Sequence, residues 1–134
     1  MLSTTLFAIS IVALSQFSVY YWRAVVAGIA AQPISGRVLV AAGIGESRIE
    51  AWHFGKLSGL LEVTPRLGAG DTGMGLVRFY YHTARLIGVL APQWAPAVAA
   101  WSQRECNVCA RYAAVQIDKR LEVNLALAAS IHSC

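Results

Sequence analysis

The stretch PAVAAWSQRECNVCARYAAVQIDKRLEVNLALAASIHSC, residues 96–134, decides the fold. It contains no glycine and, after its first residue, no proline. Proline suits the first turn of a helix, where its missing amide hydrogen is not needed. The stretch therefore predicts one helix over about residues 96–132, roughly 50 Å long at about 1.5 Å per residue. A helix of this length needs support from packing against other elements.

One face of this predicted helix carries small and apolar side chains. On a helical wheel they fall within about 60° of Cys106, and they are Ala110, Ala113, Ile117, Leu121, Ala128 and Ile131, with Cys109 at the edge. The far side carries Arg104, Asn107, Arg111, Asp118, Lys119 and Glu122. Arg120 and Asn124 intrude on the apolar face, where polar groups need a partner. Either a second protein supplies it, or Arg120 extends its charge to solvent. The expected subunit interface comprises Ala110, Ala113, Ile117, Arg120, Leu121 and Asn124.

Cys106 and Cys109 are the candidate metal ligands of the chain. His132 and Cys134 would complete a set that suits zinc or an iron–sulfur cluster, but an unbroken helix separates the two pairs by about 35 Å. The pair also lies well inside the helix, away from the N-terminal turn that lowers a thiol pKa. Three interpretations stay open. The thiols pack as small apolar side chains, they bind zinc, an iron–sulfur cluster or haem at a site between subunits, or they form a redox pair.

Two shorter helices are expected before this one. The pattern from Ser47 to Glu50 matches a capping box and predicts a helix over about 47–63. A second helix over about 74–91 ends before Pro92. The first presents Ile49, Trp52, His53, Leu57, Leu60 and Leu61 at largely helical spacing. The second carries Leu76, Phe79, Tyr80, Thr83, Leu86, Ile87 and Leu90.

The N-terminal stretch TLFAISIVALSQFSVYYW, residues 5–22, has no charged side chain and the length of a membrane-spanning helix. It ends on an aromatic cluster followed by Arg23, which is typical of the membrane interface. We therefore predict a transmembrane anchor over residues 1–31, followed by a connector over 32–46. On one side of this helix, small polar residues predict contact with another membrane helix, unless they only bond their own backbone; these are Ser10, Ser15 and Ser18.

Two other interpretations of the N-terminal stretch stay open. It is either a cleaved signal peptide, with a cleavage site near Ala30, or an apolar helix of a soluble protein. A signal peptide carries its positive charge before the apolar core, whereas here Arg23 and Arg37 follow it. If the helix is retained, these two arginines place the N-terminus outside and the rest of the chain in the cytoplasm. The uncharged residues 86–103 also allow a second span, or a hairpin corner that rests on the membrane or a partner.

The remaining motifs indicate no catalytic site. Residues 68–73, GAGDTG, match a dinucleotide-binding pattern but lack its flanking strands and acidic residue, so they predict a loop. His53 and His82 lie among aromatic residues, either as metal or haem ligands or as hydrogen-bonded structural histidines. The seven acidic residues are dispersed and form no constellation. The eleven basic residues are scattered, whereas nucleic-acid binding needs clusters.

Composition supports a membrane or protein partner. The chain is 57% hydrophobic and 13% charged, against about 25% charged residues in ordinary soluble domains. We expect an all-α protein, with one N-terminal transmembrane helix followed by a small three-helix bundle with a long C-terminal helix. The expected function is that of a non-catalytic, membrane-anchored accessory or scaffold subunit. It would contact membrane lipid and other subunits or further copies, with no cofactor and no nucleic acid. The alternative is a metal- or redox-cofactor-binding subunit that uses Cys106 and Cys109.

Overall fold

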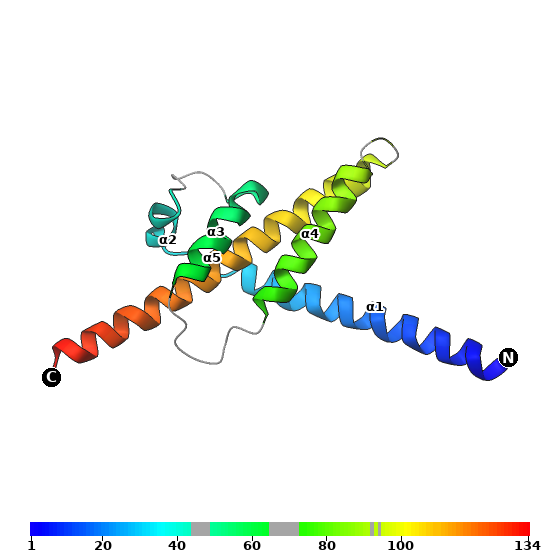
Figure 1. Ribbon diagram of the computed structural model, residues 1–134, viewed down its shortest axis with the longest axis horizontal. Helices are drawn as coiled ribbons and strands as arrows, with labels where there is room; N and C mark the ends of the chain where they lie inside the picture. Colours follow the sequence, from blue (N-terminus) through cyan, green and yellow to red (C-terminus); the bar gives the residue numbers. More distant parts are fainter. Residues whose placement is uncertain (44–48, 65–72, 92, 94) are drawn as a thin grey trace.

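The structure is a computed structural model that describes residues 1–43, 49–64, 73–91, 93 and 95–134 (Figure 1). Every regular element in these ranges is a helix, which confirms the all-α prediction. The elements are α1 (Leu2–Ala30), α2 (Gly36–Ala41), the short 3₁₀ helix η1 (Ala51–His53), α3 (Phe54–Val63), α4 (Met74–Leu90) and α5 (Pro96–His132). Ser47, Pro92 and most of the GAGDTG motif lie outside the described residues.

The long helix α5 is the element on which the others pack. α1, α2, η1, α3 and α4 all contact it, and Figure 1 shows α4 beside its N-terminal half. Small side chains of α5 lie at the centre of the core, where they let the other helices approach α5 closely. The fully buried ones are Cys109, Ala110, Ala113 and Ala114.

The helices α3 and α4 pack on α5 rather than on one another. Among the described elements, α3 and α4 have no backbone contact. Arg78 of α4 reaches across to α3, where it donates to the Ser58 carbonyl at 3.3 Å and pairs with Glu62 at 2.7 Å. The arrangement is therefore more open than the three-helix bundle expected from the sequence.

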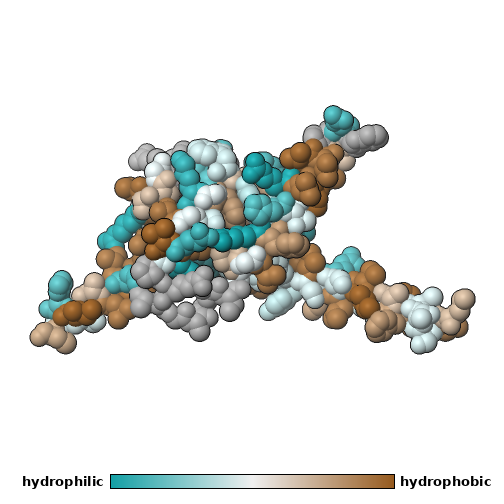
Figure 2. Space-filling model, in the orientation of Figure 1, coloured by the Kyte–Doolittle hydropathy of each residue, from teal (hydrophilic) through white to brown (hydrophobic). Residues whose placement is uncertain are grey.

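Helix α1 has two parts that differ in their surroundings. Residues 2–21 of this helix are exposed. Among the described residues, α1 is the one helix that is long and apolar enough to cross a membrane. Its last part packs on α5 and buries Val26 and Ala30. In Figure 1 the exposed part projects away from the other helices, and Figure 2 shows mostly apolar or weakly polar surface along it.

The chain becomes helical after Glu50, later than the start near residue 47 that the sequence suggests. The Glu50 backbone is extended, with φ −115° and ψ 166°. Its side chain accepts a hydrogen bond from the backbone of His53, and its own amide donates to His53 Nδ1 at 3.0 Å. Glu50 and His53 thus form a reciprocal cap at the start of η1, which the helical periodicity did not reveal.

The apolar periodicity of α4 does not mark its buried face. Six of the seven residues singled out on this helix are exposed: Leu76, Phe79, Thr83, Leu86, Ile87 and Leu90. The buried face is formed instead by Met74, Val77, Tyr81 and Ala84. This helix is apolar on two sides, so the pattern alone did not indicate which side meets α5.

Candidate functional site

Basic side chains of α5 bind the carbonyl ends of two other helices. Arg111 Nε donates to the Ala30 carbonyl at the end of α1, at 3.0 Å. Arg120 Nη1 donates to the carbonyls of Leu61 and Thr64 at the end of α3, at 2.5 and 3.1 Å. The last carbonyls of a helix have no partner within it and carry partial negative charge, so a cation stabilises them.

Acceptor side chains of α5 bind the amide ends of two further helices. Asn107 Oδ1 accepts the backbone amide of Ala51, at the start of η1, at 2.8 Å. Asp118 accepts the backbone amide of Ser35 at 3.2 Å and also its hydroxyl, just before α2 begins. Each polar group thus matches the sign of the helix end that it meets. All four polar side chains, Asn107, Arg111, Asp118 and Arg120, are thus engaged in holding other helices against α5.

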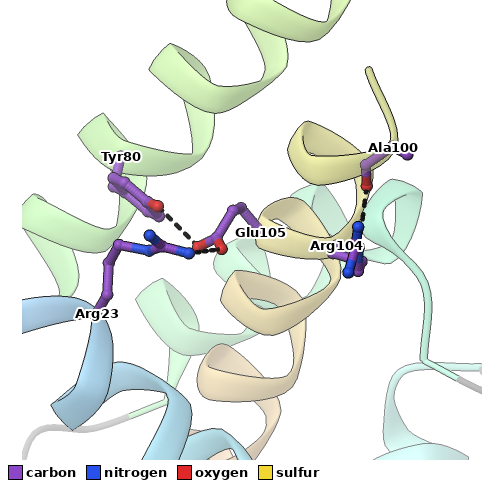
Figure 3. Close-up of polar contacts among 5 residues, drawn as sticks. All are labelled: Arg23, Tyr80, Ala100, Arg104 and Glu105. Atoms are coloured by element: carbon purple, nitrogen blue, oxygen red, sulfur yellow. Dashed lines mark hydrogen bonds and ion pairs between the residues drawn. The ribbon is translucent and has the colours of Figure 1, made fainter. Parts of the chain in front are cut away.

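Glu105 joins three helices at one point (Figure 3). Its carboxylate accepts hydrogen bonds from Arg23 Nη2 of α1 at 2.5 Å and from the Tyr80 hydroxyl of α4 at 2.7 Å. The Glu105 side chain is 14% exposed and that of Arg23 is 41% exposed. The Arg23 guanidinium also lies 5.7 Å from the centre of the Trp101 ring. Burial, reinforced by the bond to Glu105, raises the pKa of Tyr80 above its usual value.

The neighbouring Arg104 takes no part in this junction. Figure 3 shows it turned away from Glu105, and its Nε donates to the Ala100 carbonyl of the same helix at 3.5 Å. The junction is therefore a specific link made by one acidic residue of α5. It fixes the first helix against the α4–α5 pair.

Both candidate metal-binding thiols lie in the core. Cys106 is 4% exposed and Cys109 is fully buried. Burial raises the pKa of both thiols, that of Cys109 to about 12, whereas metals bind the thiolate. In the ranges that the structure describes, no three His, Cys, Asp or Glu residues come together. Cys134, at the exposed end of α5, is not near them. The geometry is that of cysteines packed as small apolar side chains.

The two histidines have different surroundings. His53 is buried and accepts the Glu50 amide, so it has the structural, hydrogen-bonded role that was one of the two interpretations. His82 is exposed on α4, edge-on to Tyr81 with ring centres 5.6 Å apart. Neither histidine belongs to a group of three or more potential metal-binding side chains within the described part of the chain.

An open groove of about 770 Å³ separates α3 from α4. Its floor is formed by α5, including Ser102 and Cys106, and its α4 wall carries Arg78, His82 and Arg85. Ser102 donates to the Ala84 carbonyl at 2.6 Å, so its hydroxyl proton is already engaged. Arg78 is held by Glu62. The described residues that line the groove include cationic, acidic and aromatic groups, and Ser102 and Cys106 donate hydrogen bonds to backbone carbonyls rather than to a base.

The residues expected at an interface occupy three kinds of place. Ala110, Ala113 and Ile117 are buried against this chain's own helices. Leu121 and Asn124 are half-buried, and Arg120 is bound to α3. The serines at positions 10, 15 and 18 are exposed, and the Ser10 hydroxyl donates to its own helix at the Leu6 carbonyl, at 2.9 Å. The part of α5 before Leu121 is thus occupied by the chain itself.

The Glu105 junction was not anticipated from the sequence. Its partners lie 82 and 25 residues away along the chain, and only the packing of both α1 and α4 on α5 brings them together. The available signal was a lone acid between Arg104 and the apolar face of the helix. Comparison with protein families, with curated proteins and with solved structures finds no match to this chain. The functional proposal therefore rests on the sequence and the geometry of this chain.

Proposed function

We propose that this protein is a non-catalytic, membrane-anchored helical subunit that serves as an accessory or scaffold in a larger membrane assembly. In this proposal α1 crosses the membrane, with its N-terminus outside and the other helices on the cytoplasmic side. One observation carries it: α1 is exposed and uncharged over residues 2–21, yet its last part is built into the core. Exposed apolar surface of this extent is favourable only in contact with lipid or protein.

The same packing supports an anchor that is retained rather than cleaved. Removal of the chain up to about Ala30 would take Val26 and Ala30 out of the core. It would also remove Arg23, the ion-pair partner of Glu105. A signal peptide is removed from the mature protein, so its residues are not expected to form part of the core of the mature fold. Arg23 and Arg37 lie on the C-terminal side of the uncharged run, which supports the proposed orientation.

The end of α5 supports the role of a subunit. Beyond Leu121 the helix projects from the other elements (Figure 1) and is largely exposed. It presents apolar side chains without cover from the described chain: Val123, Leu125, Leu127 and Ile131. A partner subunit or a second copy that packs along this arm would bury them. We do not favour a shared metal or redox centre at Cys106 and Cys109, because both thiols are buried within this chain.

Membrane integration is tested with a charged residue in the middle of the uncharged run. Leu14→Arg is expected to cost about 3–4 kcal/mol of insertion free energy and to move the protein into the carbonate-soluble fraction. Leu14→Phe keeps the position apolar and is the matched control. Intact mass of the membrane-bound protein tests retention of the first 30 residues. A soluble wild-type protein, or one shortened near Ala30, would refute the anchor.

The subunit role is tested by purification of the full chain in mild detergent after cross-linking in the membrane. We expect a co-purifying chain or a stable oligomer that is lost with Leu127→Glu on the exposed arm. Lys119→Glu, on the exposed side of the packed part of α5, is the control for added negative charge. Recovery of a lone monomer under these conditions would count against an accessory or scaffold role.

A further inference from the structure

Helix α4 exposes a largely apolar face, interrupted by Thr83, whose apolar residues we call the α4 stripe. It consists of Leu76, Phe79, Leu86, Ile87 and Leu90, which are 58%, 72%, 59%, 37% and 68% exposed. On a helix these positions lie on the side opposite the residues that face α5. Exposed apolar side chains scattered singly are ordinary, but a row along a whole helix indicates contact with something apolar.

The charged residues of α4 are both basic. Residues 74–90 include Arg78, which pairs with Glu62 of α3, and Arg85, with the imidazole of His82 between them, and no acidic residue. These three lie on one flank of the stripe, facing the groove toward α3. A helix with bulky apolar residues on one face and basic residues beside them is the kind that lies in the surface of a membrane. Anionic lipid headgroups are the complementary partners of such a flank.

The position of α4 relative to α1 agrees with this partner. Figure 1 shows α4 on the side of α5 toward which α1 projects. Tyr80 of α4 and Arg23 of α1 bind the same carboxylate of Glu105, so α4 is tied to α1 where the uncharged run ends. A membrane crossed by α1 therefore has its surface at the level of the first turns of α4. The α4 stripe faces away from α5, toward the side on which this membrane surface would lie.

We propose that α4 lies in the headgroup region of the membrane that α1 crosses, with the α4 stripe in the acyl-chain boundary and Arg85 and His82 toward anionic phospholipids. The inference rests on the proposed anchor and adds a second attachment beside it. It also explains why α4 is apolar on two sides. One side meets α5 and the other meets lipid.

Spin labels on the full chain test this placement in vesicles of phosphatidylcholine and phosphatidylglycerol. The background variant is Cys134→Ser, because Cys106 and Cys109 are buried. Single labels are introduced at Leu86→Cys on the α4 stripe, Leu14→Cys on α1 and Lys119→Cys on the exposed side of α5. Collision rates with oxygen report lipid, and collision rates with a water-soluble nickel chelate report solvent.

We expect the oxygen-to-nickel ratio at Leu86 to exceed that at Lys119 severalfold, and to fall when phosphatidylglycerol is left out. The ratio at Leu14 should be high in both kinds of vesicle. If Leu14 is in lipid but the Leu86 label is open to nickel, or closed to both reagents as under a protein, the placement of α4 is overturned and the anchor stands. If Leu14 is itself open to nickel, the anchor fails, and the inference fails with it.

Discussion

Replacement of Glu105 by glutamine is expected to loosen the junction of α1 with α4 and α5. The carboxylate accepts hydrogen bonds from Arg23 at 2.5 Å and from Tyr80 at 2.7 Å. Glutamine has nearly the same shape but offers one acceptor oxygen and no charge. The variant therefore leaves one of the two donors facing an amide NH₂ group, and it removes the counter-charge of Arg23.

The expected loss follows from the burial of the two partners. A hydrogen bond to a charged group contributes about 1.5–3 kcal/mol, and breaking a fully buried ion pair costs about 3–5 kcal/mol. Glu105 is nearly buried, but Arg23 is 41% exposed, so water screens and rehydrates its charge. We expect Glu105→Gln to lower the free energy of unfolding by about 2 kcal/mol.

The measurement is guanidinium unfolding of the detergent-solubilised protein, followed by circular dichroism. Release of α1 is followed separately by the rate of tryptic cleavage after Arg23, which should rise. Glu62→Gln is the matched control, because it removes the same charge from an exposed pair with Arg78 and should cost less than about 0.5 kcal/mol. Tyr80→Phe removes one of the two bonds to the carboxylate and should cost about 1.5 kcal/mol, at the lower end of the range for a bond to a charged group.

Equal losses for Glu105→Gln and Glu62→Gln would refute this reasoning. Such a result would mean that burial and the second hydrogen bond add nothing at the junction. Unchanged cleavage after Arg23 would further show that the carboxylate does not hold α1 in place. The ranking of the three variants is therefore a sharper test than the size of any one loss.

Three further predictions concern the core and its polar links. Arg120→Met removes the donor at the carbonyl end of α3 and should lower the free energy of unfolding by about 2 kcal/mol. The control Lys119→Met should change it by less than about 0.5 kcal/mol. Equal losses for the two variants in chemical unfolding would contradict the capping role of Arg120. Cys109→Ser buries a hydroxyl and should lower the free energy of unfolding by about 1–3 kcal/mol, whereas Cys134→Ser should leave it unchanged. A stoichiometric metal that is present in the wild type and lost from Cys109→Ser would contradict the packing role of Cys109. Burial raises the pKa of Cys109 from its ordinary value of 9.0 to about 12, so the folded chain holds this proton more tightly than the unfolded chain. Stability is then fully present below about pH 9 and declines as the pH rises toward about 12, and a melting temperature that stays flat across this range would contradict it.

The helical class and the long apolar first helix could be predicted because they depend on local properties. A run without charge, and a run without glycine or proline, restrict the backbone irrespective of tertiary contacts. The buried face of α4 depends on more. Leu86 and Val77 belong to two apolar sides of the same helix, and periodicity finds both without showing which one meets protein. Packing against α5 determines which side is buried, because Val77 and its neighbours belong to the same core as the small side chains of α5.

The polar links show the same limit at the level of single residues. Arg120 was conspicuous in the sequence as a charge on an apolar face, so its need for a partner could be predicted. Which partner it binds depends on where α3 ends, and the two carbonyls there lie 56 and 59 residues away along the chain. Glu105 gave a weaker signal, because both of its partners come from other helices. Sequence identified the residues that need a partner more readily than the partner itself.

These links also bear on how a scaffold of this design would act. Glu105, which lies on α5, binds Arg23 near the packed end of α1, and the exposed arm beyond Leu121 belongs to the same uninterrupted helix as Glu105. From Glu105 to Ile131 that helix rises about 40 Å. Because Arg111, Asp118 and Arg120 each fasten another element to the helix between these points, the packed part of α5 is held in one direction relative to α1. A partner bound to the arm would therefore be held at a defined distance from the anchor, which is what distinguishes a scaffold from a flexible tether.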